Sequence, residues 1–338
     1  MHSNHDYRSL VVVDVVDETV DTKSFVLEIP PALEVTFAYA AGQFCTFRAT
    51  VGGESVVRSY SMSSSPDIGD RFTVTVKRVP DGKLSNWMND VLAPGDAIEV
   101  LPPTGLFVLR AAEVPIVAFA GGSGITPVLS LIKSALASTA REIALIYANR
   151  SSESVIFAAE LERLRAASTG RLALHHHLDS ERGFLDAEAC AALVGERTHA
   201  DFYVCGPGPY MEAVEAGLTR RGIAASQLFI ERFEPPAGEP AASETSETES
   251  IVIRLAGRKH SVRYERGDTI LDTARRAALK PPFACEQGNC ATCMAFLDVG
   301  KVKMRANNAL SAKEVEEGWV LTCQAVPMSR EVAVDYDR

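Results

Sequence analysis

The sequence predicts three domains in series: an antiparallel β-barrel or sandwich, a parallel α/β domain, and a small domain that follows a linker. Short strands separated by turn signals fill residues 1–110. In residues 111–233, apolar strands alternate with helices, which is typical of a parallel sheet. An acidic segment at residues 234–250 then separates these two domains from a cysteine-rich third domain at residues 251–338. A chain of 338 residues is long enough for all three.

The composition excludes several classes of protein. Hydrophobic residues make up 46% of the chain and charged residues 23%, so the chain is not largely disordered. The net charge of −10 argues against general nucleic-acid binding. No apolar run reaches the roughly 18 residues of a membrane span. The first residues lack the basic and apolar regions of an export signal, and we therefore expect a cytoplasmic protein with no membrane partner.

Alternation of apolar and polar residues predicts the strands of the first domain. Phe72, Val74 and Val76 alternate with polar neighbours, and residues 43–47 and 55–62 have an extended pattern. Regularly spaced short strands of this kind favour an antiparallel barrel or sandwich.

Two motifs in the first domain suit a ligand with a flat ring and phosphates. Arg58 and Tyr60 are two residues apart on an expected strand, so both side chains point to the same face. A guanidinium binds phosphate, and a phenol ring stacks on a flat heterocycle. Gly82 to Ser85 is predicted to enter a helix, whose N-terminal amides and Ser85 hydroxyl suit a pyrophosphate. Taken alone, the first motif also fits an exposed strand face.

The second domain is predicted from strands that alternate with amphipathic helices. The expected strands are residues 114–120, 143–148, 172–176 and 202–205, with helices at residues 128–137 and 158–166 between them.

A glycine-rich loop, Gly121-Gly-Ser-Gly124-Ile-Thr126-Pro127, follows the first of these strands. Glycines allow a sharp turn and a close approach to a pyrophosphate. Thr126 is predicted to be the N-cap of the next helix and Pro127 its first residue, so that the amides of the first turn face an anion. The alternative is a turn without a ligand.

Two further segments carry candidate residues. Cys205-Gly206-Pro207 follows the fourth strand, at the edge of the sheet where ligands bind. By itself, Cys205 is predicted to be a buried core cysteine. His175-His-His177 is interpreted as a strand end, because consecutive strand residues point to opposite faces and cannot converge on one metal ion.

Charge differs on the two sides of the linker. Residues 234–249 contain five acids and no base, which predicts a flexible, self-repelling segment. Residues 251–338 hold 14 Lys and Arg against 11 Asp and Glu, a charge of +3, which leaves −13 for residues 1–250. After the linker we expect a hairpin of residues 251–255 and 260–264, followed by a helix at residues 269–279.

The cysteines of the third domain have the spacing of an iron–sulfur site. Cys285, Cys290 and Cys293 follow the pattern C-x4-C-x2-C, and Cys323 follows Cys293 after 29 intervening residues. This is the plant-type arrangement for a [2Fe–2S] cluster, in which four thiolates hold two irons. Small residues between these cysteines keep the loop slim, so that backbone amides can approach the sulfurs. A structural zinc site is the alternative.

These motifs together resemble a known family. Residues 251–338 resemble a plant-type ferredoxin domain, which implies a β-grasp fold. The order of the segments 42–44, 58–61, 82–85 and 103–107 resembles the flavin-binding barrel of the ferredoxin reductase superfamily, and the two glycine turns resemble its NAD-binding domain. The implied fold class is an antiparallel flavin-binding β-barrel, a parallel α/β nucleotide-binding domain and a β-grasp ferredoxin domain.

The resemblance also implies roles for individual residues. Tyr60 would lie on the flavin ring, and Ser61 would lie near flavin N5. Thr126 and Cys205 would orient the nicotinamide. The implied catalytic residues are Ser61, Thr126 and Cys205. Phe233 would cap the flavin or pack in the core. The implied cofactor-binding residues are Arg58, Ser59, Tyr60, Ser61, Lys77, Gly82, Lys83, Leu84, Ser85, Gly121, Gly122, Gly124, Thr126, Arg150, Cys205, Gly206, Pro207 and Phe233, and the metal ligands are Cys285, Cys290, Cys293 and Cys323.

The expected cofactors are FAD, with FMN as the alternative, a [2Fe–2S] cluster and NADH. NADH is favoured over NADPH because no pair of basic residues near Arg150 requires a 2′-phosphate. The family implied is the reductase components of multicomponent oxygenases, which pass electrons from NAD(P)H through flavin and a [2Fe–2S] cluster to a terminal oxygenase. The motifs are most similar to those of the 3-ketosteroid 9α-hydroxylase type, then to the phenylacetyl-CoA epoxidase type. A reductase for another acceptor, such as a hybrid-cluster protein, and a non-catalytic sensor remain alternatives.

Overall fold

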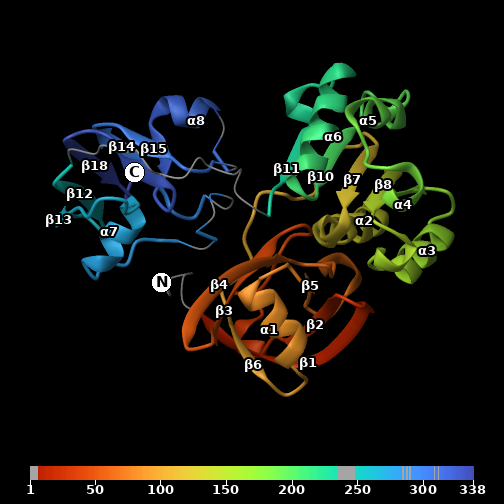
Figure 1. Ribbon diagram of the computed structural model, residues 1–338, viewed down its shortest axis with the longest axis horizontal. Coiled ribbons are helices and arrows are strands. Elements are labelled where there is room, and N and C mark those ends of the chain that lie inside the picture. The colour runs from red at the N-terminus through yellow and green to blue at the C-terminus, as the bar shows by residue number, and fades with distance from the viewer. Residues whose placement is uncertain are drawn as a thin grey trace. The chain divides into compact units, whose positions relative to one another are not determined.

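The computed structural model describes residues 7–233, 248–283, 285–286, 288, 291–307, 309–310 and 312–338. The chain divides into two compact units, residues 1–233 and residues 234–338, which are described separately (Figure 1). Most of the expected flexible linker falls outside the described residues, and the expected domain limits stay predictions. Within the described residues, no helix is both long and apolar enough to cross a membrane.

The first sheet of the larger unit is antiparallel, as predicted, and has the strand order β4-β3-β6-β1-β2-β5. Its ends are joined by a bridge between Met62, which follows β4, and Val74 in β5, so the sheet closes into a barrel. The helix α1 (Lys83–Val91) packs Leu84 and Met88 into the barrel core. The strands are β1 (Arg8–Thr19), β2 (Thr22–Glu28), β3 (Phe44–Val51), β4 (Glu54–Ser61), β5 (Thr73–Lys77) and β6 (Ala97–Val100).

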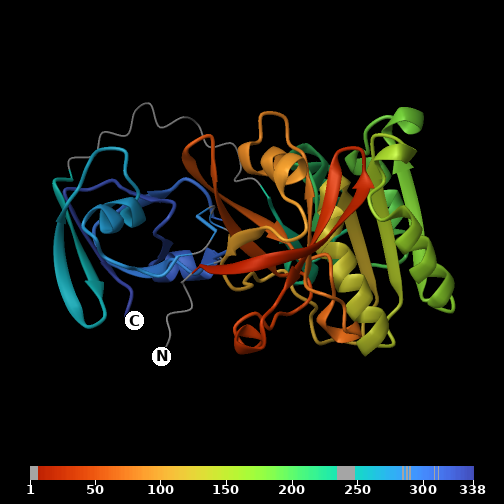
Figure 2. The same ribbon diagram turned by 90° about the horizontal axis from the view of Figure 1, so that it is seen from below.

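The second sheet of this unit is parallel, with the strand order β11-β10-β7-β8-β9. Figure 2 shows its strands in yellow to green beside the red and orange barrel. Apolar residues of α2 and α3 cover one face of the sheet, and those of α5 and α6 cover the other. The elements are β7 (Ile116–Gly121), α2 (Ile125–Ser138), β8 (Ile143–Asn149), α3 (Ala158–Ala167), β9 (Leu172–Leu178), α4 (Asp179–Arg182), α5 (Ala187–Val194), β10 (Asp201–Cys205), α6 (Gly208–Arg220) and β11 (Leu228–Glu231).

This strand order places the candidate loops at one point of the sheet. From β7 the chain moves outward through β8 and β9, and it then returns to the other side of β7 to form β10 and β11. The order therefore reverses between β7 and β10, and ligands of open α/β sheets bind in the crevice at such a switch point. The glycine loop follows β7 and the Cys-Gly-Pro turn follows β10, so both turns border this crevice.

A polar face of α2 fixes the barrel against the parallel sheet. The Ser130 hydroxyl donates to the Ser64 carbonyl at 2.6 Å, and the Ser134 and Ser65 hydroxyls are 2.7 Å apart. The buried Lys133 ammonium lies 3.0 Å from Asp70 in the barrel segment. It also lies 2.8 Å from a carboxylate of α3. We call Ser130, Lys133 and Ser134 the α2 seam.

The smaller unit is a mixed five-stranded sheet with the order β13-β12-β18-β14-β16, in which β12 and β18 run parallel. The helix α7 (Ile270–Arg276) buries Ile270 and Ala274 against the sheet, as expected of a β-grasp domain. The Thr269 side chain caps α7 by accepting from the Asp272 amide. The other elements are β12 (Ser250–Leu255), β13 (Arg258–Arg263), β14 (Met294–Val299), β15 (Val302–Met304), α8 (Ala312–Glu317), β16 (Trp319–Leu321), β17 (Ala325–Pro327) and β18 (Glu331–Asp335).

Candidate functional site

The start of α2 differs from the prediction. Gly122 to Gly124 form a turn of 3-10 helix, and α2 begins at Ile125 with Gly124 as its N-cap. The predicted N-cap role of Thr126 is therefore wrong, and Pro127 is the third residue of the helix rather than the first. The Thr126 hydroxyl instead donates to the Ser123 carbonyl at 3.0 Å. A proline is tolerated at this place because the first-turn amides have no partner within the helix.

The glycines of the two turns allow the turns to touch. A Cβ atom on Gly124 would lie 2.1 Å from the Cys205 carbonyl oxygen. A Cβ atom on Gly206 would lie 2.7 Å from the Tyr210 ring, and one on Gly121 would lie 2.9 Å from the same ring. Any side chain at these positions would push the turns apart. Gly122 has a φ of +51°, which favours glycine, and its carbonyl accepts from a tyrosine of β8.

Cys205 is a neutral, fully buried thiol. Burial, together with the charge of Glu231, raises the pKa of Cys205 well above its usual value. Glu231 is its register partner on β11, and its side chain is buried. Because the thiol stays protonated at neutral pH, Cys205 is not a thiolate nucleophile. Glu231 is not among the residues predicted from the sequence, where its only signal is an acid at the end of a short apolar strand.

Two other predicted residues of this domain have the following places. Arg150 follows β8 with its side chain exposed, and its carbonyl accepts from the Ser180 amide at 2.9 Å. Phe233 is partly buried against the same core as Cys205. His177, on β9, contacts the Gly183 carbonyl through Nε2 at 2.8 Å.

The predicted barrel residues lie on β4. Tyr60 is partly buried, its ring centroid is 5.7 Å from that of Phe47, and burial raises its pKa. Ser61 is buried opposite Phe44 of β3. The Ser59 hydroxyl bonds to Thr46, while the exposed Arg58 side chain donates to the Val57 carbonyl.

The predicted helix after Gly82 is α1, and no side chain caps its N-terminus. The exposed amides of such a first turn favour an anion. A Cβ on Gly82 would lie 2.4 Å from the Ser85 hydroxyl oxygen, which accepts from the Val79 amide. Lys83 is paired with Glu54. Lys77 lies 3.5 Å from another carboxylate, so both lysines already have partners in the barrel.

Three of the predicted cluster ligands are described, and Cys290 lies outside the described residues. Cys285, Cys293 and Cys323 are all buried, and the described cysteines form no disulfide bonds with one another. A hydrogen bond with Cys293, followed by burial, raises the pKa of Cys323, while the Gly288 amide donates to the Cys323 sulfur. Among described residues, no three His, Cys, Asp or Glu side chains converge on a single ion. A two-iron site does not require this, since its thiolates are shared between the irons.

Gly288 and Ala291 shape this loop. Gly288 has a φ of +78°, and a Cβ there would lie 2.9 Å from the Ala306 carbonyl. Ala291 has a φ of +55°, which is uncommon for a residue other than glycine. The backbone therefore follows a tight path that small residues allow, as the sequence analysis predicted for the loop.

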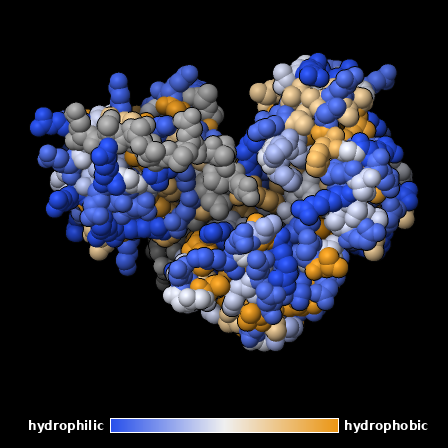
Figure 3. All heavy atoms as spheres, in the orientation of Figure 1, coloured by the Kyte–Doolittle hydropathy of each residue, from blue (hydrophilic) through white to orange (hydrophobic). Residues whose placement is uncertain are grey.

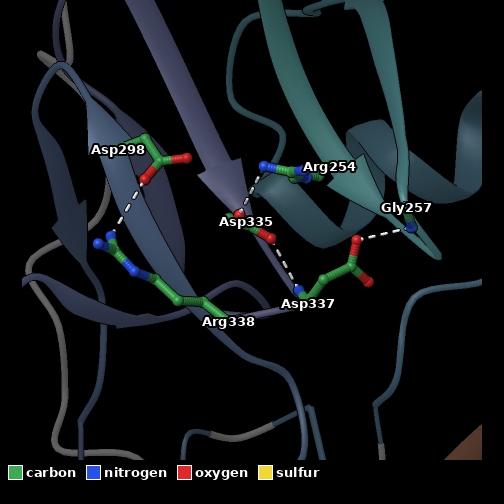
Figure 4. A pocket seen from close by; sticks show the side chains of 6 residues that line it. All are labelled: Arg254, Gly257, Asp298, Asp335, Asp337 and Arg338. Carbon is green, nitrogen blue, oxygen red and sulfur yellow. Dashed lines mark hydrogen bonds and ion pairs between the residues drawn. The ribbon is translucent and has the colours of Figure 1, made fainter.

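A pocket elsewhere in the smaller unit lacks the features of a reactive site. Its charged groups already have partners (Figure 4): Arg254 lies 3.6 Å from Asp335, Arg338 lies 3.3 Å from Asp298, and the Asp337 carboxylate accepts from the Gly257 amide at 2.8 Å. The face of the molecule drawn in Figure 3 is mainly hydrophilic, with small separate apolar groups.

Comparisons with known proteins agree with this geometry. Residues 9–109 match the model of the oxidoreductase FAD-binding domain, residues 119–216 that of the oxidoreductase NAD-binding domain, and residues 253–328 that of the 2Fe-2S iron-sulfur cluster binding domain. These matches confirm the three predicted kinds of domain.

Several relatives align with nearly the whole chain. The chain is 36% identical to the 3-ketosteroid-9-alpha-monooxygenase ferredoxin reductase component of Rhodococcus rhodochrous, over 98% of both chains. It is 32% identical to one of the subunits of the 1,2-phenylacetyl-CoA epoxidase of Escherichia coli, again over 98% of both. Among solved structures, phthalate dioxygenase reductase matches with a TM-score of 0.63 and 25% identity, over 97% of this chain and 98% of that chain.

Proposed function

The chain belongs to the family of ferredoxin reductase-type flavoproteins that are the reductase components of oxygenase systems, and from this premise we propose that its electron acceptor is an oxygenase of the 3-ketosteroid 9α-monooxygenase type. FAD, when bound, takes a hydride from a reduced nicotinamide and passes electrons singly to a [2Fe–2S] cluster. The observation that carries the proposal is 36% identity over 98% of a reductase of that system. Phenylacetyl-CoA epoxidase is the second candidate, because the similarity to its matching subunit also spans the chain.

We assign the nucleotide to the crevice between β7 and β10. The 3-10 turn of Gly122 to Gly124, which leads into α2 and has no side-chain cap at its start, suits its pyrophosphate. The Thr126 hydroxyl already donates to a carbonyl, so it is available as an acceptor for the carboxamide of the nicotinamide. The neutral thiol of Cys205 provides an apolar contact beside it. Arg150 is assigned to the adenosine ribose, and NADH is the proposed donor.

We assign the flavin to the barrel. Tyr60 would lie against its ring, and Ser61 would lie near the flavin nitrogen that takes the hydride. The exposed Arg58 side chain and the uncapped first turn of α1, at Lys83, suit the two phosphates of FAD. Ser59, Lys77 and the rest of the segment 82–85 are assigned supporting contacts.

We assign the cluster to Cys285, Cys290, Cys293 and Cys323. Together these four cysteines would hold the cluster, and the contact between the Cys293 and Cys323 sulfurs supports their belonging to one site. Ligation requires thiolates, so cluster assembly releases the protons that burial and the Cys293–Cys323 contact retain. We further propose that the protein works in the cytoplasm, where NADH is formed and thiols stay reduced.

The test is an anaerobic titration of the purified protein with NADH, followed by air and each candidate oxygenase with its substrate. Bleaching of both the flavin and the cluster absorbance, with hydroxylated steroid formed, would support the proposal. Bleaching with epoxide formed only by the phenylacetyl-CoA system would transfer the assignment to that system. No bleaching would refute the reductase assignment.

A variant separates the two cofactors. Cys323→Ser removes one assigned ligand, so NADH should still bleach the flavin while the cluster absorbance and the oxygenase product are lost. Cys190→Ala, which removes a buried thiol of α5, should keep both. A Cys323→Ser protein that retained a normal cluster and formed product would contradict the ligand assignment.

A further inference from the structure

Glu286 directly follows the assigned ligand Cys285. Its side-chain carboxylate and its backbone carbonyl both accept hydrogen bonds from other side chains. Its two carboxylate oxygens each accept a hydrogen bond of 2.7 Å from the Arg275 guanidinium in the last turn of α7. Its backbone carbonyl accepts from the Gln324 side-chain amide at 2.8 Å. Gln324 is buried and directly follows Cys323. We call these contacts the Glu286 network.

The backbone at Glu286 shows why such contacts are needed. Glu286 has a φ of +56°, a left-handed conformation that residues other than glycine rarely adopt. Such a conformation persists only where surrounding contacts hold it. The bidentate pair fixes the side chain, and the Gln324 amide fixes the carbonyl. Arg275 also lies over the ring of Phe283, at 3.8 Å, so α7 contacts the chain on both sides of Cys285.

The network places a charge pair beside the assigned cluster. The side chains of Arg275 and Glu286 are 33% and 31% exposed, so water screens them less than a fully exposed pair. Reduction adds one negative charge to a cluster, and its potential depends on nearby charges and on contacts that orient its ligands. In the intact pair, the positive and negative charges largely offset each other.

We propose that the Glu286 network positions the cysteine loop and balances the charge that sets the reduction potential of the cluster. Arg275 and Gln324 are positioning residues, since they act through Glu286 rather than on the cluster itself. The inference depends on the cysteine assignment under the proposed function, but not on which oxygenase accepts the electrons.

The test is a potentiometric titration of the full-length protein, with the electron paramagnetic resonance signal of the reduced cluster as readout. Glu286→Gln removes a negative charge and should raise the midpoint potential. Arg275→Gln leaves the Glu286 carboxylate without its guanidinium and should lower it. At the wild-type midpoint, each variant should change the ratio of oxidised to reduced cluster at least threefold, which is about 30 mV for a one-electron couple. The double variant should return close to the wild-type value.

Arg276, which follows Arg275 on α7, provides a matched control. Arg276→Gln removes the same charge from the same helix, but Arg276 pairs with Asp268 rather than with the cysteine loop. It should shift the ratio less than Arg275→Gln does. A purely structural role for the network predicts faster cluster loss without opposite shifts in potential. Shifts of the same sign in the two single variants, or shifts no larger than that of the control, would overturn the proposal.

Two further measurements keep the test decisive. If Arg275→Gln does not retain its cluster, Arg275→Lys keeps the charge but cannot make the bidentate contact. It should shorten the lifetime of the cluster, measured by visible absorbance, and leave the midpoint within the range of the control. A lifetime equal to that of the wild type would overturn the positioning role. Absence of a cluster from the wild-type protein would instead refute the cysteine assignment, and this inference with it.

Discussion

The contact between the two glycine turns gives the sharpest prediction about electron transfer. In Gly124→Ala, the new Cβ would lie 2.1 Å from the Cys205 carbonyl oxygen and 2.7 Å from the Gly206 nitrogen. Ordinary contacts of carbon need about 3.5 Å, so the turns must separate by roughly 1 Å or more. Both atoms belong to the backbone, which cannot rotate away as a side chain would. Overpacking of this kind typically costs about 1–3 kcal/mol of unfolding free energy.

A domain of ordinary stability survives such a loss, so the variant can be studied folded. The two turns bracket the assigned nicotinamide site, and a displacement of about 1 Å can lower a rate on the order of 100-fold. We therefore expect flavin reduction by NADH, measured by anaerobic stopped-flow absorbance, to slow by about that factor.

Gly208→Ala is the matched control for this experiment. Gly208 follows the same Cys-Gly-Pro turn as the first residue of α6, and a Cβ there meets nothing within 4 Å. The control should reduce its flavin at the wild-type rate. A folded Gly124→Ala protein that did the same would refute the role assigned to the contact between the turns.

Three other outcomes are expected. Lys133→Met removes the buried ammonium that pairs with Asp70 and Glu160, of which Glu160 keeps Arg163 as a partner, so denaturant titration should show a loss of about 1.5–3 kcal/mol. Lys313→Met, which breaks an exposed pair on α8, should cost less than about 1 kcal/mol. Equal losses would contradict the importance of the α2 seam. Burial raises the pKa of Cys190 to about 12 and that of Cys205 above its usual value, so the folded chain keeps thiol protons that the unfolded chain loses above about pH 9. The free energy of unfolding should therefore decline as the pH rises from 9 to 12. Cys190→Ala should make this decline less steep. The +3 charge of residues 251–338 favours an acidic acceptor, so acceptor reduction should slow as salt rises above roughly 0.1 M, and a rate independent of salt would exclude this attraction.

The fold could be predicted because each domain has its own local signal. Alternation of apolar residues marks the barrel strands, strand–helix alternation marks the parallel sheet, and the cysteine spacing marks the third domain. The motifs Arg58-x-Tyr60 and Gly121 to Gly124 could be placed on a strand and a loop, since their neighbours define those elements. The roles of these residues rest on resemblance and await the measurements above.

What the sequence could not predict depends on contacts between distant segments. Thr126 looked like an N-cap because Ser and Thr favour that position, but the 3-10 turn of the preceding glycines moves the helix start to Ile125. Glu231 was missed because only the register of β11 against β10 brings it beside Cys205. The pairing of Arg275 with Glu286 is also invisible in the sequence, since eleven residues separate them and neither matches a known motif.

The α2 seam has a consequence for exchanging modules between reductases. A cut near residue 110 divides the chain between the barrel and the nucleotide domain. Ser130, Lys133 and Ser134, which bond to the barrel, lie on the nucleotide-domain side of that cut. In a chimera that takes only its barrel from another reductase, these three side chains would face a barrel surface that lacks their native partners. A graft meant to keep this docking therefore has to carry the three seam residues together with their barrel partners, Gly42, Ser63, Ser64, Ser65 and Asp70.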